Sequence, residues 1–265
     1  MKVYISVDIE GVAGITHWDE AEIGKEGYPE YREQMTIEAI AACEGALNAG
    51  ATEILVKDAH WTARNIYPER LPEEARLIRG WNGEPFSMIE GLDSSFRAAA
   101  MVGYHSGAGA GGNPLAHTMT GKDAKILING ELTSEYLLHR NAAAMRGVPV
   151  VFLAGDKNLC DTAMATNRAV HTVATKDGAG GSTTSTHPMA AAKQIRDGME
   201  AALRDDAARE LPTLAEHFEM EVWFKEHEDA YQASYFPGAR LVDPHCVAME
   251  TDDYYEIGRT LHFIL

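Results

Sequence analysis

The chain has few cysteines and no long apolar run, and each of these features excludes certain classes of protein. Only three cysteines occur, far apart and without CxxC spacing: Cys43, Cys160 and Cys246. Neither a disulfide framework nor a zinc knuckle is expected from such a set, so a reducing cytoplasm is the expected location. No apolar run is long enough to span a bilayer, and Asp8 and Glu10 interrupt the stretch where a signal peptide needs apolar residues.

Basic residues are scarce relative to acidic ones. The chain has 23 Lys and Arg against 40 Asp and Glu, for a formal net charge of −17 with histidine neutral. Binding to nucleic acid requires clustered Lys and Arg, and docking on an anionic membrane requires the same side chains. We therefore expect no nucleic-acid partner and no membrane partner.

The sequence does contain an alternation of strand-like and helix-like segments. Strand-like patterns cover residues 2–7, 52–56, 98–104, 126–128, 148–153 and 170–175, and helix-like patterns cover 28–49, 132–145 and 188–203. Residues 148–153 are apolar throughout, which is typical of a strand buried on both faces. The alternation predicts an α/β fold with a mostly parallel sheet and helices on both faces.

From about residue 208 the pattern changes character. Short strand-like segments at 219–224, 239–242 and 247–250 precede a closing helix from residue 252. We predict an α/β domain over residues 1–207 and a small α+β C-terminal appendage over 208–265, packed on the first and involved in assembly. The glycine-rich segments 103–112 and 178–184 are expected to be flexible loops, and neither has the spacing of a phosphate-binding fingerprint.

The sharpest local feature is Asp8-Ile9-Glu10-Gly11, at the end of the first predicted strand. Side chains two apart on an extended chain point the same way, and two neighbouring carboxylates are unfavourable unless a cation lies between them. Gly11 lets the backbone turn away sharply. The alternative is a pair of solvated acids at the start of a loop.

Two other predicted strands are followed by histidine. His60, in Asp58-Ala59-His60, follows residues 52–56, and His105 follows 98–104. Ligands of open α/β sheets bind at the carboxyl ends of the strands, so these side chains and the two carboxylates are offered to one crevice. Imidazole and carboxylate without thiolate suit a catalytic zinc ion.

Three further residues have open roles at this point. His117 lies in a loop close to His105 and is a candidate ligand, a proton shuttle or a surface residue. Glu131 and Glu135 flank the start of the next predicted helix, where an acidic side chain also complements the helix dipole. Spacing alone does not choose between the two as a ligand.

Several sequence blocks, in the same order, resemble the DppA-type zinc D-aminopeptidases, a family of self-compartmentalising dizinc peptidases. The resemblance runs over most of the chain. Its markers are SVDIEG (6–11), VKDAH (56–60), FSMIEGLD (86–93), VGYH (102–105), AHTM (116–119), GVPV (147–150) and AGD (154–156).

The resemblance implies two zinc ions per chain, with Asp8 bridging them. Glu10 and His60 then bind one ion, and His105 and Glu135 bind the other, with Glu131 as the runner-up for the last position. It also places His117 beside the metals as the catalytic residue, which stabilises the oxyanion or protonates the leaving amine.

Two more residues have supporting roles in this picture. Asp58 is expected to orient the His60 ligand. Lys176 corresponds to a lysine of the family pattern and would help to shape the site, although a lone lysine is ordinarily solvated.

The implied activity is a zinc-dependent aminopeptidase, a hydrolase that removes N-terminal residues, with D-residues expected, from short peptides. A zinc pair lowers the pKa of a shared water to about 7, which supplies a metal-activated hydroxide at neutral pH. The family assembles into homodecamers of two stacked rings with inward-facing sites, which implies the same homo-oligomer here.

Three positions depart from the family pattern and leave two alternatives open. Ser134 stands where the family has glycine, and His139 followed by Arg140 stands where it has asparagine. These departures are expected beside the substrate pocket, where they bear on substrate preference. The alternatives are a dizinc amidase or deacylase acting on a non-peptide amide, and a non-catalytic metal-binding scaffold.

Overall fold

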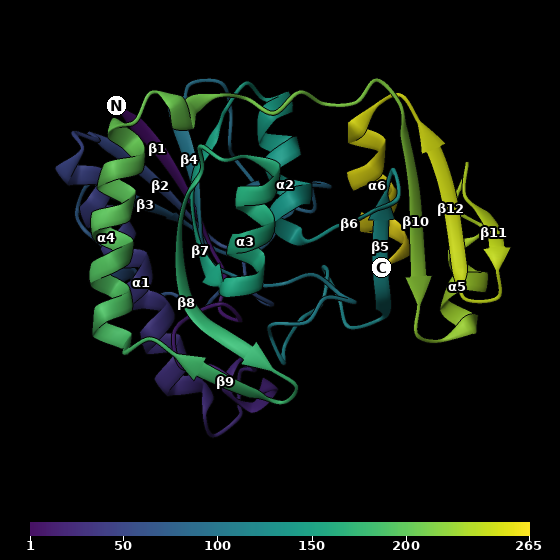
Figure 1. Ribbon diagram of the computed structural model, residues 1–265, viewed down its shortest axis with the longest axis horizontal. Helices are drawn as coiled ribbons and strands as arrows, with labels where there is room; N and C mark the ends of the chain where they lie inside the picture. The colour runs from purple at the N-terminus through teal and green to yellow at the C-terminus, as the bar shows by residue number, and fades with distance from the viewer.

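The computed structural model describes residues 1–265, and its main element is a seven-stranded sheet (Figure 1). The strand order is β3-β2-β1-β4-β7-β8-β9, and all neighbours are parallel except β8 and β9. The strands are β1 (Lys2–Val7), β2 (Glu53–Asp58), β3 (Ala75–Ile78), β4 (Ala98–Tyr104), β7 (Val150–Asp156), β8 (His171–Ala179) and β9 (Ser182–Ser185). The predicted mostly parallel sheet is confirmed.

Helices cover both faces of this sheet, as predicted. One face carries α1 (Tyr28–Asn48) and α4 (Pro188–Arg204), and the other carries α2 (Glu135–Met145) and α3 (Lys157–Thr166) (Figure 1). A separate buried apolar cluster lies on each face. On β7, Val151 and Ala154 belong to the cluster under α1 and α4, whereas Leu153 belongs to the other. The strand is apolar throughout because it is buried on both faces.

A second sheet is antiparallel and has five strands in the order β11-β12-β10-β5-β6. They are β5 (Asp123–Ile128), β6 (Glu131–Leu132), β10 (Phe218–Phe224), β11 (Arg240–Asp243) and β12 (Cys246–Thr251). The helix α6 (Tyr254–Ile264) contacts both α2 and β12, and α5 (His227–Ala233) contacts β10 and β12. Four 3-10 helices complete the chain: η1 (Trp18–Glu20), η2 (Pro68–Arg70), η3 (Ser87–Ile89) and η4 (Ala207–Arg209).

Two local predictions were wrong. Residues 126–128 do not continue the main sheet, because Ile126 pairs with Val222 of β10 in the second sheet. Residues 178–184 are not a flexible loop but the end of β8, a turn and part of β9 in a hairpin. The division of the chain into 1–207 and 208–265 stays a prediction.

The strand order creates a crevice at the carboxyl end of β1. The chain proceeds from β1 to β2 and β3 on one side, and then crosses to β4 on the other side. Loops that follow the strands at such a reversal face a common crevice. The loop after β1 lies directly on β4, since Gly11 N donates to Gly103 O at 2.7 Å and a Cβ on Gly11 would lie 1.8 Å from Tyr104 O.

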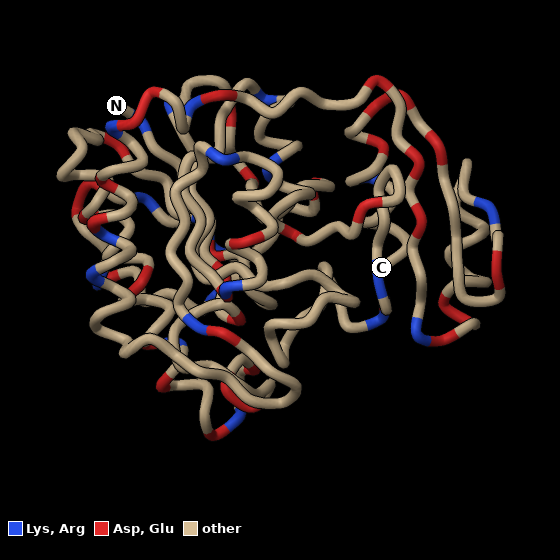
Figure 2. Tube along the Cα trace, in the orientation of Figure 1, with Lys and Arg blue, Asp and Glu red and all other residues tan.

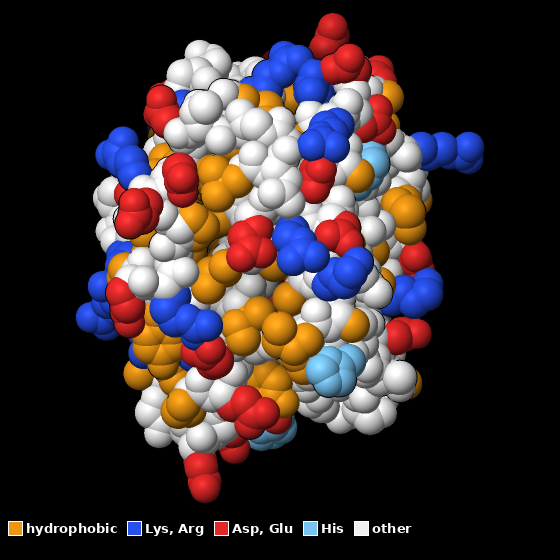
Figure 3. Space-filling model, turned by 90° about the vertical axis from the view of Figure 1, so that its left-hand side faces the viewer, with side chains coloured by type: hydrophobic (Ala, Val, Ile, Leu, Met, Phe, Trp, Pro, Cys, Tyr) orange, Lys and Arg blue, Asp and Glu red, His pale blue; other side chains and the backbone are white.

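Acidic and basic residues are distributed along the whole chain trace (Figure 2). On the face that carries α1 and α4, acidic, basic and apolar side chains are mixed, and no continuous basic patch covers it (Figure 3). None of the helices has the length and apolar character needed to cross a membrane.

Candidate metal centre

Asp8, Glu10 and His60 meet where β1 and β2 end. His60 Nδ1 lies 3.3 Å from Asp8 Oδ1 and 3.1 Å from Glu10 Oε1. All three side chains are buried, and one ligand-type atom from each lies within 4.8 Å of the others. The sequence prediction that these three residues converge is confirmed as geometry.

A second group shares Asp8 with the first. His105 Nε2 lies 3.5 Å from Asp8 Oδ2 and 3.2 Å from Glu135 Oε2. One oxygen of Asp8 therefore faces His60 and the other faces His105, which is the arrangement that a bridging carboxylate requires. Of the two candidate glutamates, Glu135 at the start of α2 joins this group, whereas Glu131 on β6 is exposed outside it.

Backbone carbonyls fix the orientation of three imidazoles. The bonded nitrogens are His60 Nε2, His105 Nδ1 and His117 Nδ1, and each lies 2.9 Å from its acceptor, the carbonyl oxygens of Ala21, Ser106 and Leu115 respectively. A carbonyl oxygen only accepts, so each of these ring nitrogens carries a proton. His60 Nδ1 and His105 Nε2 then face the carboxylates, and in the neutral ring each would offer its lone pair to a metal.

Three buried polar atoms of the two groups have no hydrogen-bond partner: Glu10 Oε2, His105 Nε2 and Glu135 Oε2. Buried polar atoms without a partner are costly in a native fold. A cation coordinated by these atoms removes that cost. Two imidazoles with three carboxylates and no thiolate form a donor set that suits zinc at a catalytic site. The residues present therefore fit the expected metals.

The pKa values of the buried groups reflect their mutual contacts. Burial lowers the pKa of His105, but the adjacent Glu135 carboxylate raises it more, to about 10. Burial raises the pKa of Glu135, but the imidazoles of His105 and His117 bring it to about 2. Burial and the neighbouring Glu10 carboxylate raise the pKa of Asp8 well above its usual range. Such coupled, shifted groups are concentrated at functional sites.

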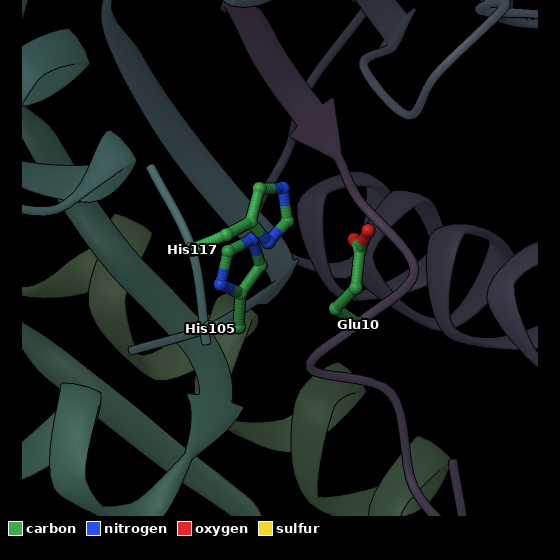
Figure 4. Close-up of side chains that lie close together, drawn as sticks. All are labelled: Glu10, His105 and His117. Atoms are coloured by element: carbon green, nitrogen blue, oxygen red, sulfur yellow. The ribbon is translucent and has the colours of Figure 1, made fainter. Parts of the chain in front are cut away.

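His117 stacks on His105 at the edge of the site. Their ring centroids are 4.3 Å apart with 14° between the planes, and Figure 4 shows the two rings lying against each other, across from Glu10. Burial lowers the pKa of His117, and the neighbouring His105 lowers it further. His117 Nε2 lies 3.6 Å from Glu135 Oε1. The centroid of the Trp18 ring lies 5.2 Å from the centroid of the His117 imidazole.

Asp58 acts on the loop that carries His60 and not on the imidazole. Asn65 Nδ2 donates to Asp58 Oδ1 at 2.8 Å and to the backbone carbonyl of His60 at 2.7 Å. The backbone N–H of Asn65 donates to the same carboxylate. Asp58 therefore positions His60 only through Asn65, since the imidazole itself bonds to a backbone carbonyl.

Lys176 is buried, so the expectation of a solvated side chain was wrong. Its Nζ donates to Glu10 O at 2.6 Å and to Ile15 O at 2.8 Å. Because Lys176 lies on β8, these two hydrogen bonds tie the loop after β1 to that strand. A single lysine in a sequence carries no local sign of burial, because the burial depends on a loop about 160 residues away in the chain.

A cavity of about 350 Å³ opens on the two groups. Its acidic and imidazole side is formed by Asp8, Glu10, His60, His117 and Glu135, and its other lining residues include Ala59, Trp61, Trp81, Met88, Met119 and His262. The residues of the second set were not predicted as site residues from the sequence. Trp61 directly follows the predicted His60 and Met119 lies two residues after His117, but nothing in the sequence connects Trp81 or His262 with the site.

The three departures from the family pattern are not among the lining residues of this cavity, although Ser134 directly precedes the lining residue Glu135. Ser134 is the N-cap of α2 and accepts a hydrogen bond from Leu137 N. His139 is buried, and Arg140 donates to Thr166 Oγ1 at 2.8 Å. His139 and Arg140 belong to α2, and Ser134 caps its start.

A doubly wound parallel sheet, with buried carboxylates and imidazoles at its switch point and a cavity open to them, defines an α/β protein of the metallohydrolase class. The sequence model of the M55 peptidases, described as D-aminopeptidase, matches residues 1–263. The chain belongs to this family.

Two relatives illustrate the similarity. A D-aminopeptidase of Bacillus subtilis (strain 168) is 40% identical over 156 residues, which are 59% of this chain and 56% of that protein. The aligned part thus spans little more than half of that relative. The solved structure of the Zn-dependent D-aminopeptidase DppA from Bacillus subtilis, a self-compartmentalizing protease, has a TM-score of 0.93 and 30% identity. The match covers 100% of this chain and 96% of that one.

Proposed function

We propose that the protein is a zinc-dependent aminopeptidase that removes N-terminal D-residues from short peptides. The observation that carries this proposal is the position of Asp8, whose two oxygens face two separate ligand groups beside one cavity. Membership of the M55 family over residues 1–263 supports the preference for D-residues. The matched Bacillus subtilis sequence and the matched solved structure both carry the name D-aminopeptidase.

In this proposal two zinc ions would be held by Asp8, Glu10, His60, His105 and Glu135, with Asp8 common to both ligand groups. When bound, the zinc pair supplies Lewis acidity toward the scissile carbonyl and lowers the pKa of water at the site. The protein contributes preorganisation. Met119 N donates to Glu135 Oε1 at 2.7 Å, which orients that carboxylate and leaves Oε2 free as a ligand atom.

His117 serves as the acid–base group. Its Nδ1 proton is committed to the carbonyl of Leu115, so Nε2 carries the lone pair of the neutral ring. Burial lowers its pKa, which favours the neutral imidazole that can accept a proton. Once protonated at Nε2, it can donate to the oxyanion or to the leaving amine.

We further propose a homo-oligomer, a decamer as the family resemblance implies, that encloses the cavities and admits short peptides. The Bacillus subtilis structure of a self-compartmentalizing protease supports such an assembly. Apolar side chains that a monomer would leave exposed support it too: Tyr231 and Tyr235 near α5, and Phe263 on α6, are 58%, 72% and 68% exposed.

The test is to purify the protein without chelator, count zinc per chain, and assay D-Ala-D-Ala beside L-Ala-L-Ala. We expect about two zinc ions per chain and D-selective cleavage that a chelator abolishes and added zinc restores. Bound zinc without cleavage of either dipeptide would instead favour the amidase or the scaffold. Absence of both zinc and cleavage would refute the proposed function.

A further inference from the structure

The cavity beside the metal centre has an apolar wall that the proposed chemistry does not use. Trp61 and Trp81 are its largest members, with Met88 and Met119 beside them. The two tryptophans are 52% and 39% exposed, although each has enough apolar surface to stabilise a core. Aromatic side chains that line a cavity next to converging polar groups are typical of a ligand subsite.

Trp61 is held in an uncommon backbone conformation. Its φ is +45°, in the left-handed region that bulky residues rarely adopt. Trp81 Nε1 donates to Trp61 O at 2.7 Å, and Asn65 Nδ2 donates to the preceding carbonyl, that of His60. Such a conformation persists only where surrounding contacts impose it, and it is concentrated at functional sites.

The buried ammonium group of Lys57 packs against the ring of Trp81. Lys57 Nζ lies 4.1 Å from the centroid of the Trp81 ring, 3.3 Å from Glu90 Oε2, and also donates to Gly80 O. Glu90 Oε2 in turn accepts from Asn82 N at 3.2 Å. One ion pair thus fixes the ring and the residues on both sides of it. The lysine of VKDAH and the glutamate of FSMIEGLD have their partners here and do not touch the metal ligands.

We propose that Trp61 and Trp81 form the subsite for the side chain of the substrate's N-terminal residue, and that this subsite selects bulky apolar side chains. The inference rests on the proposed function. His117, which would protonate the leaving amine, lies at the His105 group, whereas Trp61 directly follows His60 in the other group. The acyl side of the scissile bond, with the first side chain, therefore faces the tryptophans.

The wall also disfavours a cationic first side chain. The ammonium of Lys57 already lies over the Trp81 ring, where it uses the negative potential of one face. A second cation gains little from that ring, whereas a neutral apolar side chain gains contact area with both indoles.

The test compares Trp61→Ala and Trp81→Phe with Trp223→Phe, whose indole lies on β10 outside the cavity. Trp61→Ala removes the indole but keeps the carbonyl that accepts from Trp81 Nε1, so it is the cleaner change. Trp81→Phe keeps an aromatic ring near Lys57 and provides an independent variant. We would measure kcat/KM for D-Ala-Gly, D-Leu-Gly and D-Phe-Gly, and the zinc content of each variant.

We expect Trp61→Ala to lower kcat/KM for D-Phe-Gly by about 10-fold or more relative to D-Ala-Gly, at unchanged zinc content. Trp81→Phe should shift the same ratio in the same direction by a smaller factor, and the control should leave the ratio at its wild-type value. An unchanged ratio in both cavity variants overturns the inference. An equal loss on all three peptides, with lowered zinc content, also overturns it, because the role would then be structural.

Different results would refute the proposed function and the proposed subsite. A wild-type protein that hydrolyses none of the three peptides refutes the proposed function, and the subsite with it. A wild-type protein that cleaves them, with variants that keep its preference, refutes only the subsite.

Discussion

The imidazoles of His105 and His117 lie ring on ring, 4.3 Å apart between centroids, yet their free nitrogens have different surroundings. His105 Nε2 lies within 3.5 Å of a carboxylate oxygen from both Asp8 and Glu135. His117 Nε2 has only Glu135 Oε1, at 3.6 Å. We propose that this difference makes His105 a metal ligand and His117 a proton carrier, and the two roles can be tested separately.

Replacing His117 with alanine should lower kcat by about 10²–10⁴-fold while zinc content stays at the wild-type level, because the loss concerns proton transfer. Zinc analysis and steady-state kinetics on D-Ala-D-Ala measure both quantities. His217→Ala is the matched control, since that histidine is exposed and pairs with Asp252 away from the cavity. Glu10, His105 and His117 also come close enough to form a ligand group, so a fall in bound zinc would make His117 a ligand instead.

Glu135→Gln and Glu131→Gln should differ sharply in metal content. Glu135 is buried with Oε2 unpartnered beside His105, whereas Glu131 is exposed on β6. We expect Glu135→Gln to reduce bound zinc from about two ions to about one per chain, because an amide is a poor zinc ligand. Glu131→Gln should retain both ions. The opposite result from metal analysis would assign the ligand role to Glu131.

Lys176→Met should destabilise the protein by about 2 kcal/mol or more, because the carbonyl of Ile15 loses its lysine donor and that of Glu10 keeps only Asn113 Nδ2. Urea unfolding followed by circular dichroism measures the loss. Lys193→Met is the control: its ion pair with Asp197 is on the surface, and its removal should cost less than about 1 kcal/mol. Equal losses in the two variants would mean that Lys176 does not hold the loop after β1.

Glu38 makes stability depend on pH. Burial raises its pKa from 4.5 to about 7, against hydrogen bonds from Ala13 N and Gln34 Nε2 that lower it. Between these pH values the folded protein keeps a proton that the unfolded chain releases, so the free energy of unfolding falls as pH rises through this window. The loss is on the order of 3 kcal/mol and is complete above the folded pKa.

Glu38→Gln should therefore raise the free energy of unfolding near pH 8 and change it little near pH 4.5, since the amide keeps the acceptor oxygen. Urea titrations across this pH range test the prediction. Glu44→Gln, at an exposed position of the same helix, should leave the pH dependence as in the wild type. A parallel pH dependence in Glu38→Gln and the wild type would show that Glu38 does not cause it.

Elements with a strong local pattern were predictable. The helix expected at 28–49 is α1 (Tyr28–Asn48), and the strand expected at 148–153 overlaps β7 (Val150–Asp156). Residues 126–128 form a strand as expected, but three apolar residues do not indicate which strand they pair with. That choice depended on β10, about 90 residues later in the chain.

Some residues of the site were likewise predictable from the sequence, and others were not. Carboxylates and histidines that follow parallel strands were identifiable in the sequence, because the carboxyl ends of those strands must face one edge of the sheet. The choice of Glu135 over Glu131 required the start of α2, and the wall of Trp61 and Trp81 required the Lys57–Glu90 ion pair between β2 and the loop after η3. Local residue patterns thus specify strands, helices and the chemistry at their ends. Which side chains meet across a cavity depends on contacts between distant segments, and those contacts form only when the whole chain has folded.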